Sequence, residues 1–73
     1  MLGKVISITP NGEMIIVKVL NDGSYSILEL FGDTVSVGDI LRGDFRSLGG
    51  ENFYNVTQSE KLSACVQDYD VAF

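Results

Sequence analysis

Few side chains in this chain of 73 residues could perform acid–base chemistry, because it contains no histidine and one cysteine. General acid–base catalysis would therefore fall to carboxylates, lysines or tyrosines. Asp33, Asp39 and Asp44 lie in or beside predicted turns, where aspartate commonly accepts hydrogen bonds from the nearby backbone. We interpret all three as structural residues, and the sequence predicts that the protein is not an enzyme.

The residue types also disfavour metal and thiol chemistry. A zinc site needs about four ligands, which a chain without histidine and with a single cysteine does not assemble. The Asp68-x-Asp70 spacing could suit a hard cation, but calcium takes six to eight oxygens from an organised loop. A reactive Cys65 thiolate would need a cationic neighbour, and Lys61 would serve only on a helix. We therefore expect no catalytic residue, metal or cofactor.

The composition is acidic, with ten Asp and Glu residues against five Lys and Arg, and the formal net charge is −5. This sign favours solubility and repels nucleic acid at long range. The N-terminal residues lack the pattern of a secretory signal, and no apolar run approaches the roughly 20 residues of a membrane span. With the lone cysteine, these features predict a cytoplasmic protein that has no membrane partner.

The predicted strands, which would position any binding residue, are arranged around segment 13–20, which is rich in β-branched residues. Its alternating residues are apolar on both faces: Ile15, Val17 and Val19 on one, and Met14, Ile16 and Leu20, with Lys18, on the other. A strand of this kind is normally covered on both faces and lies in the middle of its sheet. We therefore expect it to be hydrogen-bonded to a neighbour on each side.

Four more segments are predicted as strands: 2–9, 25–31, 39–46 and 53–58. In the first, Ile6 and Ile8 should share one face, opposite Val5. The segments 10–12 and 21–24 contain Asn-Gly and Asp-Gly, which favour tight hairpin turns, so the first three strands should form a meander. Val35 and Val37 are expected to plug one end of the core, and residues 47–50 to form a flexible loop.

The segment 59–69 fits two structures. Leu62, Ala64 and Val66 alternate as in a strand, whereas Leu62, Val66 and Tyr69 would share a helix face. Thr57 and Glu60 also match a capping box. We favour a strand, because the flanking pattern is β throughout.

Five or six short strands separated by polar turns predict a small all-β barrel of the oligonucleotide/oligosaccharide-binding (OB) type, with an SH3-like barrel as the alternative. Residues 1–73 make a single domain. Because free termini are usually polar, the apolar end Val71-Ala72-Phe73 suggests the N-terminal domain of a longer protein.

Several short motifs resemble a cold-shock domain, a five-stranded OB-fold barrel. They are Met1-x-Gly3-x-Val5, Asn11-Gly12, Asp22-Gly23-Ser24, Ile27-Leu28-Glu29-Leu30 and Val37-Gly38-Asp39. The resemblance implies binding of single-stranded nucleic acid. The family stacks bases on aromatic residues of its second and third strands, but the matching positions here hold Glu13, Ile15, Leu28 and Leu30.

If the protein binds nucleic acid, we expect Tyr25 and Tyr54 to stack on bases. Lys18 and Arg42 should pair with phosphates. The alternative is a protein–protein or intramolecular interaction domain that uses the same face, including Met14 and Ile27. Two interpretations of Ile16 and Ile27 remain open. We favour burial in the core, over an exposed apolar patch with a cationic rim.

Overall fold

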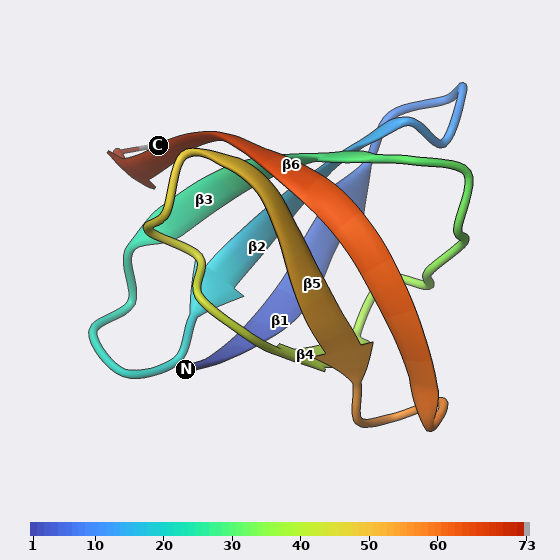
Figure 1. The fold of residues 1–73 in the computed structure, drawn as a ribbon. Coiled ribbons are helices and arrows are strands. Elements are labelled where there is room, and N and C mark those ends of the chain that lie inside the picture. Colours follow the sequence, from blue (N-terminus) through green and yellow to red (C-terminus); the bar gives the residue numbers. More distant parts are fainter. Residues whose placement is uncertain (73) are drawn as a thin grey trace.

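The computed structural model describes residues 1–72, in which six strands and no helix are found (Figure 1). The strands are β1 (Leu2–Ile8), β2 (Met14–Val19), β3 (Tyr25–Leu30), β4 (Ile40–Arg42), β5 (Gly49–Asn55) and β6 (Glu60–Val71). Their order β1-β2-β3-β6-β5-β4 closes into a barrel, because β4 also pairs with β1, and all the pairs are antiparallel. The predicted small all-β barrel is confirmed.

The first four strands form a Greek key. The strands β1, β2 and β3 follow one another as the predicted meander, and the chain then returns so that β4 lies beside β1. The OB-fold is likewise a Greek-key barrel, though with five strands. Here the long, arched β6 closes the barrel by pairing with both β3 and β5 (Figure 1).

The predicted strand boundaries are accurate for the meander and less so beyond it. The three strands of the meander match the prediction to within one residue at each end. The strand predicted at 39–46 is shorter, since β4 ends at Arg42, and the predicted loop 47–50 already contains the start of β5. The segment 59–69 is a strand, as favoured. The Thr57 hydroxyl accepts a hydrogen bond from the Ile40 amide instead of capping a helix.

The barrel interior is filled by one apolar core, to which every strand contributes. Strand β2 is paired on both sides, as predicted, and its inner residues Ile15, Val17 and Val19 are fully buried. Phe45, from the β4–β5 loop, stacks on Phe53 with ring centroids 5.0 Å apart. The other core residues are Val5, Leu28, Leu30, Leu41, Leu62, Ala64 and Val66.

A β-bulge in β1 contradicts the prediction of which side chains share a face of this strand. The pairing with β2 shifts register between Val5 and Ser7, which leaves Ile6 as the extra residue. Val5 and Ile8 therefore both face the core, whereas Ile6 is 38% exposed. The prediction that Ile6 and Ile8 share a face is wrong, because strict alternation fails across a bulge.

Among the described residues, no second layer covers the outer face of the barrel, so the favoured burial of Ile16 and Ile27 is also wrong. The two residues are direct cross-strand partners on the outer face and are only half-buried. Of the two predicted plugs, Val35 packs against the core and Val37 is 64% exposed. The terminal Phe73 lies outside the described residues.

Asp39 is buried and joins two connections at one end of the barrel. Its Oδ2 accepts hydrogen bonds from the Ser36 amide, Asn55 Nδ2 and Gln58 Nε2 at 2.9, 2.8 and 2.7 Å. Burial by itself raises the pKa of Asp39, but these three donors outweigh it and lower the pKa overall. This hydrogen-bond network supports the interpretation of Asp39 as a structural residue.

Candidate binding surface

Four of the five basic side chains lie exposed on the outside of the barrel. In residues 1–72, both salt bridges involve the fifth, Arg46. The other four therefore have no carboxylate partner within the described chain: Lys4, Lys18, Arg42 and Lys61.

Cross-strand pairing brings these cations together with two tyrosines. On one side, Lys18 of β2 lies between Tyr25 of β3 and Lys4 of β1. On the other side, Tyr54 of β5 lies between Arg42 of β4 and Lys61 of β6. These two groups meet on β1, where Arg42 pairs with Leu2, two residues before Lys4. We call the series Tyr25, Lys18, Lys4, Arg42, Tyr54 and Lys61 the cationic belt.

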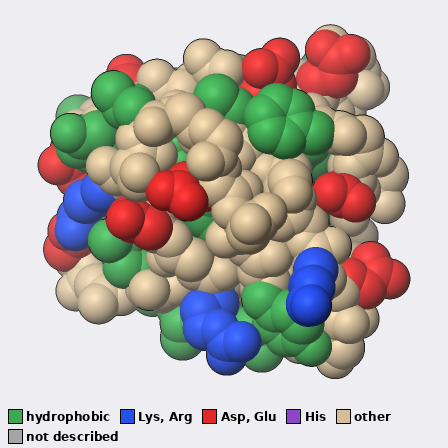
Figure 2. All heavy atoms as spheres, in the orientation of Figure 1, with side chains coloured by type: hydrophobic (Ala, Val, Ile, Leu, Met, Phe, Trp, Pro, Cys, Tyr) green, Lys and Arg blue, Asp and Glu red, His purple; other side chains and the backbone are tan. Residues whose placement is uncertain are grey.

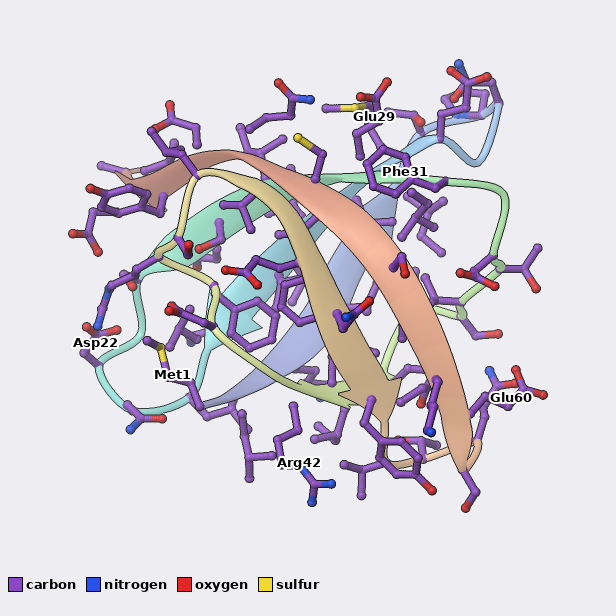
Figure 3. All side chains as sticks on the ribbon, viewed as in Figure 1. Met1, Asp22, Glu29, Phe31, Arg42 and Glu60 are labelled. Atoms are coloured by element: carbon purple, nitrogen blue, oxygen red, sulfur yellow. The ribbon has the colours of Figure 1, made fainter. Side chains whose placement is uncertain are left out.

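The cationic belt crosses all six strands on their outer face. Figure 2 shows two blue regions with a green one between them at the lower edge of the molecule, where Figure 3 labels Arg42. Its five steps between neighbouring strands, at ~4.8 Å each, give a path of about 24 Å across the sheet. The Arg42 guanidinium carbon lies 5.2 Å from the centroid of the Tyr54 ring, which is a cation–π distance.

Lys4 and Lys18 are directly opposite one another in the β1–β2 ladder. Like charges at such positions destabilise a sheet by repulsion. Neither lysine has a carboxylate partner among residues 1–72. Their repulsion is therefore not offset by an ion pair within the described residues, and a bound anion would relieve it.

A groove of about 710 Å³ extends from the cationic belt over the outer face of β5 and β6. Arg42, Tyr54 and Lys61 line it, as do the smaller polar residues Asn52 and Ser63. Gly43 also lines the groove, and a Cβ atom there would overlap the Phe53 ring. Asp33, from the β3–β4 connection, contributes the one carboxylate among the groove residues and accepts a hydrogen bond from the Ser63 amide at 3.2 Å.

Arg46 has a structural role and does not belong to the cationic belt. Its guanidinium group binds Asp22 and Ser24 of the β2–β3 turn and also Asp70 of β6. The pKa of Asp22 is lowered to about 2, mainly by hydrogen bonds from the Ser24 amide and hydroxyl and then by Arg46. Arg46 thus joins a hairpin, a loop and the last strand, and its charge is neutralised there.

A second, apolar groove of about 280 Å³ lies on the outer face of the meander. Met14, Ile16 and Ile27 line it together with Ser7 and Thr9. Met14 and Ile16 share the outer face of β2 with Lys18, so this groove adjoins the cationic belt.

The six predicted site residues therefore occupy two adjacent places. Four of them are on the cationic belt (Lys18, Tyr25, Arg42 and Tyr54), and two are in the apolar groove (Met14 and Ile27). Lys4 and Lys61 were not among the predicted residues. Alternation with buried Val5 and Leu62 shows that both point outward, but their partners depend on long-range strand pairing.

The positions that the cold-shock resemblance assigns to stacking do not form a surface. Ile15, Leu28 and Leu30 are in the core, and only Glu13 is exposed. Asp44 accepts a hydrogen bond from the Arg46 amide, as expected for a structural turn residue, and Cys65 is half-buried. Within residues 1–72, no three His, Cys, Asp or Glu side chains are grouped as metal ligands would be.

Comparison with family models, curated proteins and solved structures yields no match. The described residues also include no helix of the length and apolar character needed to cross a membrane.

Proposed function

We propose that the protein is a non-enzymatic module that binds single-stranded nucleic acid along the cationic belt. The observation that carries the proposal is the grouping, on one continuous path, of two tyrosines and four cations that have no carboxylate partner within residues 1–72. Proteins that bind single strands without sequence readout combine these two kinds of side chain: cations follow the backbone, and aromatic rings stack on bases.

The geometry favours a single strand over a duplex. The cationic belt is about 24 Å long and follows the curved outside of a barrel, which a flexible strand can match. OB-fold sites accommodate about 4–16 nucleotides. The net charge of −5 opposes approach at long range, so we expect binding to be weak and strongly salt-dependent.

Titration of a labelled single-stranded oligonucleotide of about ten nucleotides at low salt, followed by fluorescence anisotropy, tests the proposal. We expect Tyr54→Ala to weaken binding about fivefold or more, because stacking contributes ~1–3 kcal/mol per base. Arg42→Gln should also weaken it. Arg46→Gln is the matched control, since it removes the same charge from a residue outside the cationic belt.

The folded state of each variant is checked by circular dichroism, because Arg46 also stabilises the barrel. Absence of binding at low salt would overturn the proposal. Equal losses for Arg42→Gln and Arg46→Gln would overturn it too, because net charge alone would then explain the affinity.

A second candidate function, binding of a protein partner, is favoured by the apolar groove. Its exposed lining is almost entirely apolar, and on a soluble domain such surface commonly marks a contact site. If this candidate is correct, Ile16→Ser and Ile27→Ser should abolish complex formation or concentration-dependent sedimentation while leaving oligonucleotide affinity unchanged. A monomer at all concentrations that pulls down no partner would count against it.

A further inference from the structure

From the composition of the groove over β5 and β6 we infer that it holds a nucleobase next to the cationic belt and prefers guanine. This inference rests on the proposed function, and it names the base that the groove selects. Tyr54 is shared by the cationic belt and the groove, so a strand that follows the belt places a base at the mouth of the groove.

The groove presents one strong hydrogen-bond acceptor, the exposed Asp33 carboxylate. A carboxylate has about four acceptor positions, and the hydrogen bonds of Asp33 in the described chain use one, for the Ser63 amide. Its remaining acceptor positions are available to a ligand. A charged acceptor at this place discriminates between bases by the donors on their edges.

Asn52 supplies the complementary donor. Its Oδ1 accepts a hydrogen bond from the Ser63 hydroxyl at 3.0 Å, while its Nδ2 makes no hydrogen bond within residues 1–72. Lys61 lines the same groove and is a second donor. The groove thus places an acceptor group and donor groups around one space large enough for a purine base.

Guanine matches this arrangement best. Its Watson–Crick edge carries two adjacent donors, N1–H and the N2 amino group, which can bind both oxygens of a carboxylate, and its O6 can accept from Asn52 or Lys61. Adenine and cytosine offer one amino donor next to a ring acceptor. In thymine and uracil, the single N–H lies between two carbonyl oxygens that the carboxylate repels.

Phe31 extends the groove at the end away from the cationic belt. It is 59% exposed, and it borders a smaller hollow that shares Asn52 and Ser63 with the larger groove. Figure 3 shows Phe31 on the upper side of the molecule beside β6 and Arg42 on the lower side below β5. Gly50 leaves the floor beside Phe31 without a side chain, so this ring is a platform for the neighbouring base.

The test compares two labelled oligothymidylates that differ at one central position, which is guanine in one and adenine in the other. The wild-type protein should bind the guanine strand about fivefold or more tightly, as expected for one bidentate contact. Asp33→Asn should abolish the preference, because an amide has one acceptor oxygen and turns a donor toward the N–H groups. Glu60→Gln, the matched control beside Lys61, removes the same charge outside the groove and should keep it.

Asparagine can still accept the Ser63 amide, and circular dichroism verifies folding. A second variant, Asn52→Ala, should reduce the preference without changing the groove charge. If both strands bind equally to the wild type, or if Asp33→Asn retains the preference, the guanine inference is overturned and the proposed function stands. Absence of binding to both strands overturns the proposed function and the inference with it.

Discussion

At the scale of single residues, the five basic side chains have two different roles. Arg46 is held by Asp22 and Asp70 and fixes the position of a turn relative to β6. The four cations of the cationic belt have no such partner in the part of the chain that the structure describes. The sequence predicts Lys18 and Arg42 as contact residues, but the structural role that distinguishes Arg46 from them could not be predicted. That distinction depends on Asp22 and Asp70, which are 24 positions away from Arg46 on either side.

The Asp22 carboxylate should make stability pH-dependent in acid. Its pKa is about 2 in the folded protein against an ordinary value of 3.8. A lowered folded-state pKa means that the ionised group stabilises the fold above about pH 4, and that this contribution is lost as the pH falls from about 4 to about 2. Wild type should therefore be more stable than Asp22→Asn at about pH 5, and most of the difference should be lost by about pH 2. Thermal melts across this range measure it; a difference independent of pH would contradict the assignment.

Gly43 is required by the packing of Phe53 beneath it. A Cβ atom at Gly43 would overlap the Phe53 ring, which is stacked on Phe45 in the core. We expect Gly43→Ala to lower the free energy of unfolding by about 1–3 kcal/mol, measured by urea denaturation. Gly50→Ala is the control, because the Cβ there would be 3.9 Å from Phe31, an ordinary contact. Equal effects of the two substitutions would contradict this explanation.

At the scale of elements, strand β2 shows both what the sequence predicts and where prediction fails. Its β-branched composition and the Asn-Gly and Asp-Gly turns correctly predicted a strand paired on both sides. The same pattern wrongly predicted that Ile16 is covered, because periodicity identifies faces but does not show whether a second layer exists. The bulge at Ile6 was not predictable either, since it arises from register between two strands.

The two faces of β2 should differ in their contribution to stability. Ile15 is fully buried in the core, whereas Ile16 is half-buried on the outer face. Ile15→Ala should therefore destabilise the protein by about 2–5 kcal/mol, the usual range for such a cavity. Ile16→Ala should cost about 1 kcal/mol, because much of its surface already contacts solvent. Urea denaturation of both variants measures the difference, and equal losses would mean that the outer face is covered.

At the scale of the whole molecule, charge is distributed unevenly around an acidic barrel. The all-β barrel could be predicted from turn chemistry and alternation, and so could most residues of the cationic belt, since they lie at outward positions of predicted strands. Closure of the barrel by β6 could not be predicted, because it joins segments far apart in sequence. The groove beside Tyr54 depends on that closure, and Asp33 and Lys61 were therefore not recognised as its neighbours.

The dependence of oligonucleotide affinity on salt tests the cationic belt most directly. Each cation that pairs with a phosphate of a single strand contributes about −0.7 to the slope of log K against log salt concentration. Four such cations predict a slope of about −2.8, and the double variant Lys4→Gln with Lys18→Gln should reduce it to about −1.4. A slope near zero, or one that the double variant leaves unchanged, would contradict the account.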